Sequence, residues 1–212
     1  MLAHNNLGIA YNEKGMLDEA ISEFKNTISI DPNSALAHYL LGINYKIKGM
    51  IEEAISEFKK TIAINPSNAG AHHFLGIVYG EKGMYDEAIF ELKEAIVINP
   101  NFVVAHVELG NIYIKKEIFD EAISKLKKAI DINPNDARAH HILGIAYHKK
   151  SLNSLAAEQY YKAGLLYVEG DDRENALKAY EDLKLTNSDE REKALFEKLY
   201  PDLEQNKSEP SK

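Results

Sequence analysis

The chain has 212 residues, with 33 acidic and 25 basic side chains and a formal net charge of −8 at pH 7. It therefore has no excess of positive charge to neutralise phosphates, and nucleic acid is not expected as a partner. No stretch reaches the ~18 consecutive apolar residues of a membrane span, and the first residues lack the basic start and apolar core of a signal peptide. There are no cysteines, which excludes disulfides and thiolate chemistry. We expect a soluble, cytoplasmic protein without membrane insertion.

The chain repeats itself at an offset of 34 residues. The segments DEAISEFKNTISIDPN, EEAISEFKKTIAINPS, DEAIFELKEAIVINPN and DEAISKLKKAIDINPN begin at Asp18, Glu52, Asp86 and Asp120. At the same offset AHNNLGIAY, AHYLLGINY, AHHFLGIVY, AHVELGNIY and AHHILGIAY begin at Ala3, Ala37, Ala71, Ala105 and Ala139. A fixed period of this length is typical of stacked helical repeats, and five units are visible.

Each unit is predicted to be a pair of helices, because apolar residues recur at helical spacing twice. In the first unit these are Leu7, Ala10 and Tyr11, then Ala20, Ile21, Phe24 and Ile28. Glycines at Gly15, Gly49 and Gly83 suit the left-handed end of the first helix, and prolines such as Pro32 end the second. Asn33, Ser67, Asn101 and Asn135 are expected to cap the next first helix.

A glycine also recurs inside each first helix, at Gly8, Gly42, Gly76, Gly110 and Gly144. Glycine there costs roughly 1 kcal/mol relative to alanine, so it needs an offsetting gain. We expect close approach of two helices, with the recurring tyrosines, of which Tyr11 is the first, filling the space beside the glycine.

The pattern of a large residue, then Leu-Gly, Tyr, Ala, Phe and Pro resembles the tetratricopeptide repeat family. The first unit matches at His4, Leu7, Gly8, Tyr11, Ala20, Phe24 and Pro32. Histidine replaces the family's usual tryptophan, and Leu92 and Leu126 replace phenylalanine. The resemblance implies an all-α fold: a right-handed α-solenoid of antiparallel helix pairs that binds proteins.

On this basis we divide the chain into five repeats, 1–34, 35–68, 69–102, 103–136 and 137–168. Residues 169–200 form a degenerate sixth repeat or capping helices, and 201–212 a disordered tail. The pattern fades after Tyr147, where Ser151 replaces the turn glycine. A second register also fits, with Tyr160, Gly164 and Tyr167 in the family positions of a sixth repeat. Helices are expected over 154–169, 172–185 and 189–199, and the first helix has no preceding helix to cover it.

Histidines occupy one position of every unit, at His4, His38, His72, His106 and His140. A row spread along a solenoid does not converge on one ion as a zinc site requires, so we interpret it as packing. No nucleophile with a placed base, phosphate-binding loop or HExxH is present. We expect no enzymatic activity, no metal and no cofactor. Charges on the second helices, such as Glu57, Lys59 and Lys60, are interpreted as a solvated face.

The residues that vary from unit to unit form a separate stripe along each first helix, at helical spacing. In tetratricopeptide proteins this stripe lines the concave groove that binds peptides. The predicted groove residues are Asn5, Ile9, Asn12, Tyr39, Ile43, Lys46, His73, Ile77, Val107, Asn111, Ile114, His141, Ile145 and His148. Together with Leu2, Leu36 and Val104 of the same stripe they form a mostly apolar groove, with Tyr39 as the strongest single anchor. The family's carboxylate clamp for chaperone tails is absent, because Asn5 and Ile9 occupy its lysine and asparagine positions.

These observations predict a scaffold whose apolar concave groove holds a protein or peptide segment with apolar anchors. One alternative is a regulatory or substrate-targeting arm of a larger enzyme, such as a glycosyltransferase, since AHNNLG resembles the repeats of O-linked N-acetylglucosamine transferases. That family's asparagine ladder, however, survives only at Asn6. Another alternative is self-association through the uncapped N-terminal helix.

Overall fold

The structure, a computed structural model, describes residues 2–200, and these contain α-helices and no strand. The helices are α1 (Leu2–Glu13), α2 (Leu17–Ile30), α3 (Ala35–Ile47), α4 (Ile51–Ile64), α5 (Ala69–Glu81), α6 (Tyr85–Ile98), α7 (Val103–Lys115), α8 (Phe119–Ile132), α9 (Ala137–Lys149), α10 (Asn153–Glu169), α11 (Arg173–Lys184) and α12 (Asp189–Leu199). This confirms the all-α class predicted from the period. The predicted tail, 201–212, lies outside the described residues.

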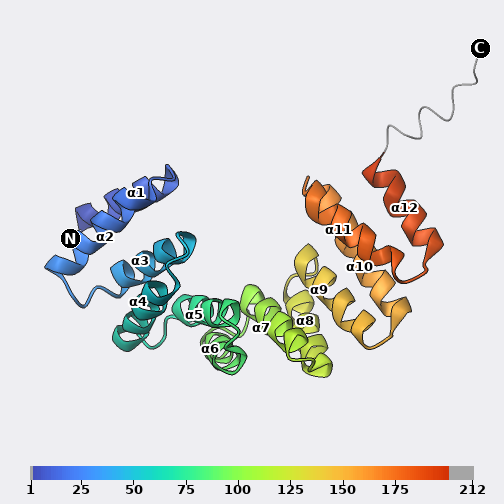
Figure 1. Cartoon of the computed structure of the whole chain (residues 1–212), viewed down its shortest axis with the longest axis horizontal. Helices are drawn as coiled ribbons and strands as arrows, with labels where there is room; N and C mark the ends of the chain where they lie inside the picture. The colour runs from blue at the N-terminus through green and yellow to red at the C-terminus, as the bar shows by residue number, and fades with distance from the viewer. Residues whose placement is uncertain (1, 201–212) are drawn as a thin grey trace, which may run out of the picture. The chain divides into compact units, whose positions relative to one another are not determined.

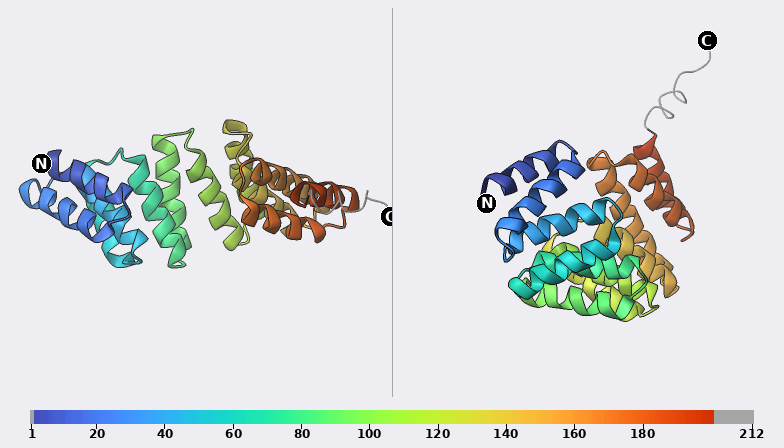
Figure 2. Two further views of the ribbon diagram at one scale, coloured as in Figure 1. Left: turned by 90° about the horizontal axis from the view of Figure 1, so that it is seen from above. Right: turned by 60° about the vertical axis from the view of Figure 1, so that its left-hand side comes forward.

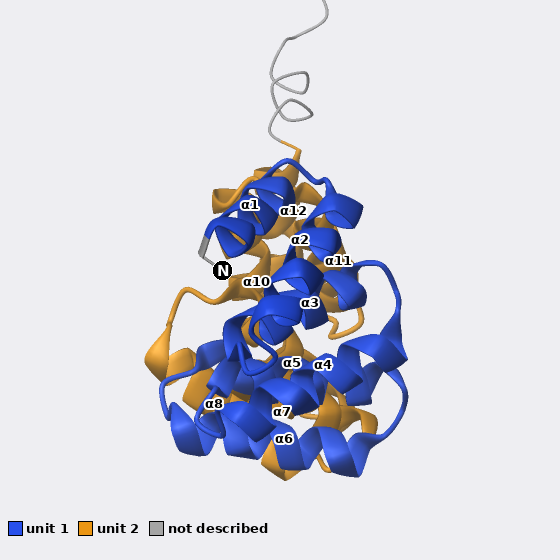
Figure 3. Cartoon of the chain, turned by 90° about the vertical axis from the view of Figure 1, so that its left-hand side faces the viewer, with its two compact units in different colours: residues 1–105 blue, residues 106–212 orange. Residues whose placement is uncertain are grey.

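The chain divides into two compact units, residues 1–105 and 106–212 (Figure 3). In the first unit, α1 packs on α2, α3 on α4 and α5 on α6, each as an antiparallel pair (Figure 1). In the second unit, α9 packs on both α8 and α10, and α10 also contacts α11 and α12 (Figure 2). Helix α7 begins with the last residues of the first unit and continues in the second.

The recurring helix glycines mark the points where the two helices of a pair approach most closely. A Cβ atom added at Gly42 would lie 2.7 Å from the Phe58 ring of α4, and one at Gly76 would lie 2.7 Å from Leu92 of α6. The close approach is therefore confirmed, but its partner was predicted wrongly. The side chain that fills the space beside the glycine belongs to the second helix of the pair, and not to the tyrosine three residues after the glycine. A side chain three residues further along the same helix lies against the surface of that helix and does not reach the space between the two helices.

The turn between the helices of each pair needs one residue in the left-handed region. Gly15, Gly49 and Gly83 adopt it with φ of 72°, 73° and 77°, as the sequence predicts. In the next two repeats Glu117 and Ser151 take the same conformation with φ of 60°. The turn geometry is therefore kept where the glycine is lost, and a residue with a Cβ carries the strain.

The predicted N-caps are wrong by one residue. Ser34, Asn68 and Asp136 cap α3, α5 and α9, and their side chains accept from the backbone N–H three residues on. The backbone N–H of Asn33 instead donates to Asp31 Oδ1, and the residues preceding the other caps do the same. The first residue after each proline is part of the turn that follows the preceding helix. The second residue after the proline is therefore the one that caps the next helix.

The histidine row joins neighbouring elements inside the repeats. His38 Nδ1 lies 2.5 Å from Glu57 Oε2 on α4, and His38 Nε2 donates to the carbonyl oxygen of Pro32 at 3.0 Å. His72 and His140 make the same two contacts, to Glu91 and Gln159 and to the carbonyls of Pro66 and Pro134. Each of these histidines is buried and ties its helix to the paired helix and to the preceding turn.

The solvated face expected on the second helices holds for Lys59 and Lys60, which are exposed, but is wrong for Glu57. Glu57 is buried against His38 and also pairs with Lys60, 2.7 Å away. The Lys59 ammonium lies 5.8 Å from the centre of the Tyr79 ring in the following repeat. Sequence alternation did not reveal the contacts of Glu57 with His38 and of Lys59 with Tyr79, because these two partners lie about twenty residues away on other helices.

The last helices begin and end within two residues of the predicted positions. Helix α10 contributes to two junctions. A Cβ atom at Gly144 of α9 would lie 2.6 Å from the Tyr160 ring of α10, as a second helix requires. One at Gly164 of α10 would clash with the Leu195 side chain of α12, whereas the first-helix glycines of the regular repeats meet the helix that follows directly. The contact of the first register is therefore present, and Gly164 marks a close approach of a different helix.

Candidate partner-binding surface

In the first unit the predicted groove residues lie on α1, α3 and α5, and an aromatic cluster joins α3 to its neighbours. The Tyr39 ring is 6.0 Å from that of Phe74 and 6.3 Å from that of Phe58, and Phe58 and Phe74 stack at 5.7 Å. A Cβ atom at Gly70 would lie 2.7 Å from Tyr39 Oη, so the glycine leaves room for this ring. Burial raises the pKa of the Tyr39 hydroxyl above its ordinary value.

The other predicted residues of this unit differ in how much of each side chain a partner could contact. Asn5 and His73 are buried, and the His73 ring lies 5.1 Å from the rings of both Phe74 and Phe102. Ile43 and Ile77 are half-buried, and Ile9 is exposed. Asn5 and His73 thus form the wall of the surface, while the isoleucines can still be contacted.

An ion pair lies at the end of this surface that is formed by the C-terminal turns of α3 and α5. Lys46, near the end of α3, lies 2.9 Å from Glu81 at the end of α5, and the Lys46 side chain is more covered than that of Glu81. The lysine is therefore neutralised within the protein. Glu81 remains the more accessible partner, so the end of the stripe is more acidic than the sequence suggests.

In the second unit the predicted residues lie on α7 and α9, and they form a more polar surface. Val107 is 2% exposed and is closed to a partner. His141 Nε2 lies 2.7 Å from Asp182 Oδ2 of α11, and its ring meets those of Tyr160 and Tyr167 edge-on at 5.7 and 6.2 Å. The half-buried residues of this unit are Asn111, Ile114, Ile145 and His148. In the first unit Asn12 and Lys46 are half-buried as well. The stripe is thus not uniformly apolar.

Polar groups that the sequence did not point to shape this second surface. Arg138 lies 2.6 Å from Glu108 across two first helices. Burial, followed by the nearby Asp172 charge, raises the pKa of the Tyr167 hydroxyl. The buried Nδ1 of His148 and the Oδ1 atoms of Asn5 and Asn12 have no hydrogen-bond partner within residues 2–200. His148 lies on α9 of this unit, whereas Asn5 and Asn12 lie on α1 of the first unit. All three atoms are closed to solvent, so they are part of the packing behind the stripe and do not contact a ligand directly.

Models of the tetratricopeptide repeat match residues 8–49, 44–83, 78–117 and 110–151, and a further one matches residues 160–189. These matches cover most of the chain. The chain belongs to the tetratricopeptide repeat family. The last match begins inside α10, in agreement with the second register.

Solved tetratricopeptide structures resemble the chain over most of its length. The crystal structure of MamA is 30% identical with a TM-score of 0.71, and the match covers 78% of this chain and 97% of MamA. YrrB, described as a tetratricopeptide protein with an unusual peptide-binding site, is 25% identical with a TM-score of 0.67, covering 84% of this chain and 90% of YrrB. A protein of Thermus thermophilus, TTC0263, is 22% identical with a TM-score of 0.68, covering 86% and 98%, which shows the fold alone. No curated protein matches the chain.

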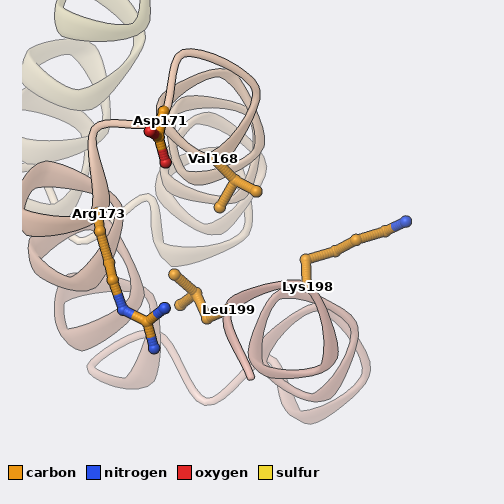
Figure 4. A pocket seen from close by; sticks show the side chains of 5 residues that line it. All are labelled: Val168, Asp171, Arg173, Lys198 and Leu199. Atoms are coloured by element: carbon orange, nitrogen blue, oxygen red, sulfur yellow. The ribbon is translucent and has the colours of Figure 1, made fainter. Parts of the chain in front are cut away.

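One cavity lies at the end of the array, among residues outside the predicted stripe. It has a volume of about 200 Å³ and is lined by Val168, Asp171, Arg173, Lys198 and Leu199, from α10 to α12 (Figure 4). The Arg173 guanidinium also lies 5.3 Å from the centre of the Tyr200 ring. In Figure 4 Arg173 and Leu199 point toward each other, whereas Lys198 points away. Among the lining side chains, Arg173 thus supplies a cationic group to the cavity and Asp171 a carboxylate.

Within residues 2–200, no group of three or more histidine, aspartate or glutamate side chains is placed to hold a metal ion. None of the helices α1 to α12 is both long and apolar enough to cross a membrane.

Sequence reasoning missed Phe74, Phe102, Glu81, Tyr167 and Asp182 as neighbours of the stripe. They lie outside the variable stripe of the first helices from which the groove was predicted, so a single-helix pattern does not include them. For Phe74 and Asp182, their departure from the repeat pattern could have indicated a special role. Phe74 stands where the other units have asparagine, leucine, glutamate or isoleucine, and Asp182 lies on a helix outside the five regular repeats.

Proposed function

We propose that the chain is a protein-interaction scaffold, and that the stripe on α3 and α5 holds an apolar anchor of a peptide or protein segment. Membership of the tetratricopeptide family supports the general role. The observation that carries the specific proposal is the half-buried set of Tyr39, Ile43 and Ile77 beside the Tyr39–Phe58–Phe74 cluster. A preformed apolar surface on rigid helices binds without paying the entropy of ordering itself.

The ligand class follows from the surroundings of these residues. The aromatic cluster fits an aliphatic or aromatic side chain, since rings pack well against both. Lys46 is neutralised by Glu81, so the end of the stripe favours a basic or neutral residue over an acidic one. An acidic chaperone tail is therefore a poor fit. We infer an extended or helical segment with one or two large apolar side chains and a basic neighbour.

The test starts from peptides selected against the immobilised chain from a random library. Their affinities are then measured by fluorescence anisotropy for the wild type and for Ile43→Gln and Ile77→Gln. We expect each substitution to weaken binding at least roughly tenfold, about 1.4 kcal/mol, because central apolar contacts dominate interface energy. Selected peptides should be rich in large apolar residues with lysine or arginine beside them.

A matched control is Phe90→Gln, which replaces an exposed apolar residue on α6 in the same unit. It should leave the affinity unchanged. If Phe90→Gln weakens binding and the isoleucine variants do not, the partner uses the second helices, and the proposed site is wrong. Circular dichroism and thermal unfolding of every variant separate a lost contact from a lost fold.

A further inference from the structure

The outer face of α1 is uncovered, unlike the same face of the first helices that follow a helix pair. Leu7 is 42% exposed, whereas the equivalent Leu41, Leu75 and Leu143 are 3%, 1% and 3% exposed. Ala3 and Ala10 are exposed too, and with Leu7 they lie at spacings of four and three residues on one side of α1. This α1 face is apolar and has no helix packed on it among residues 2–200.

The internal junctions show what such a face receives. In three of them the second helix of one repeat packs on the first helix of the next: α2 on α3, α4 on α5 and α8 on α9. The contacts at their edges repeat. Lys25, Lys59 and Lys127 lie 5.7, 5.8 and 5.9 Å from the ring centres of Tyr45, Tyr79 and Tyr147. Asp18, Glu52 and Asp120 form ion pairs with Lys48, Lys82 and Lys150.

These contacts define a donor and an acceptor pattern. The donor helix carries an acidic residue and, seven residues later, a lysine, as in Asp18 and Lys25. The acceptor carries a tyrosine and, three residues later, a lysine, as in Tyr45 and Lys48. Seven residues are almost two helical turns, so both donor groups lie on one side of the helix. The junction thus combines apolar packing with a cation–π contact and an ion pair in fixed register.

Helix α1 and its turn carry the complete acceptor pattern. Tyr11 and Lys14 stand at the positions of Tyr45 and Lys48, next to Ala3, Leu7 and Ala10. Within residues 2–200 Tyr11 has no cation above its ring, and Lys14 has no ion-pair partner, although their counterparts have both. The face therefore carries the same residues that receive a donor helix at the internal junctions.

We propose that the α1 face binds an amphipathic helix of another protein that has an acidic residue followed seven positions later by lysine, with alanine and isoleucine after the acid. This site is separate from the stripe on α3 and α5. A second copy of the chain is the poorer candidate. Its α2, α4 and α8 are engaged, and Asp86 of α6, which precedes Lys93 by seven residues, already has a partner. In α11 and α12 the residues seven positions after Glu174, Asp189 and Glu190 are Glu181, Phe196 and Glu197, none of them a lysine.

The test uses the whole chain and a synthetic peptide with the sequence of residues 16–31, which contains the donor pattern of α2. Isotope-labelled chain is titrated with peptide to about 1 mM, the weak end of the specific affinity range, and followed by NMR. We expect saturable shifts at the amides of α1 and of Lys14. Leu7→Asp should weaken binding at least roughly tenfold. Leu155→Asp is the matched control, since Leu155 is 41% exposed on α10.

A charge reversal tests the register. Lys14→Glu should weaken binding roughly two- to fivefold, the size expected of an exposed ion pair, and the Asp18→Lys peptide should restore it. Ile77→Gln in the stripe should have no effect, which separates this site from the proposed groove. The proposal is overturned if no saturable shift appears, if Leu7→Asp binds normally, or if Ile77→Gln removes binding. Self-association of the chain that Leu7→Asp abolishes, seen by sedimentation without peptide binding, would also overturn it.

Discussion

At the scale of the residue, the repeat depends on a few positions where a single atom decides the packing. The helix glycines exist because the paired helix puts a ring or a leucine where a Cβ atom would be. The turn glycines exist because their φ is positive. Alanine should destabilise the protein at both kinds of position, but for different reasons, and each gives a prediction.

Gly42→Ala should destabilise the protein by about 1–2 kcal/mol. Alanine favours a helix by up to about 1 kcal/mol over glycine, but its Cβ would lie 2.7 Å from the buried Phe58 ring, and overpacking of a filled core costs more than that gain. Urea unfolding measures the difference. Gly170→Ala is the control, because the nearest atom to its Cβ is 3.4 Å away, and its stability should change by less than about 0.5 kcal/mol.

Ser151→Gly should stabilise the protein by about 0.5–1 kcal/mol. Ser151 has a φ of 60°, which strains a residue with a Cβ, and glycine removes that strain at a smaller cost in chain entropy. Thermal unfolding should show a higher midpoint. Gly49→Ala, at the same turn position with a φ of 73°, should lower it. Equal effects of both substitutions would show that the turn is not strained.

Tyr39→Ala should cost about 2 kcal/mol in stability, because Tyr39 packs on both Phe58 and Phe74. Loss of binding in this variant would therefore not distinguish a contact from a packing defect. Tyr39→Phe keeps the ring and should leave the unfolding midpoint within a few degrees of the wild type. Comparing the two variants by thermal unfolding separates the ring's packing from its hydroxyl.

At the scale of the element, each helix pair is fastened to its neighbours by side chains at fixed offsets. The buried histidines join the two helices of a repeat, and lysines on the second helix stack on tyrosines of the next first helix. This scheme changes at the end of the array. Helix α11 begins with a side-chain cap, Asp172, which α2, α4, α6, α8 and α10 lack. Helix α10 makes close contacts with both α9 and α12. The last elements therefore depend on local polar contacts.

The cap of α11 should make that helix sensitive to acid. Asp172 accepts from the side-chain and backbone N–H groups of Asn175, and these hydrogen bonds lower the pKa of the Asp172 carboxyl. A lowered folded-state pKa means that the stabilisation is present above the unfolded pKa of about 4 and is lost as pH falls through the lower folded value. NMR titration should show α11 fraying in that range, and Asp172→Asn should remove most of the pH dependence of this helix. Fraying that persists unchanged in that variant would assign it to other carboxyls.

At the scale of the whole molecule, a repeat array is held by contacts between neighbours, so damage should stay local. In the Gly42→Ala variant, hydrogen exchange should accelerate most in α3 and α4 and least in α11 and α12. Mass spectrometry of the exchanged protein measures this directly. Uniform acceleration along the chain would instead indicate one cooperative transition.

The sequence by itself determined the helix pairs, the turn glycines, the close helix approach and the family, because these follow from local conformational rules repeated at a 34-residue period. Only the tertiary structure decided which groups meet. Phe58 lies beside Gly42, Ser34 is the N-cap of α3, His141 pairs with Asp182, and Val107 is buried. Such contacts join residues from different helices, and their distances depend on how helices cross, which a pattern along one helix does not contain.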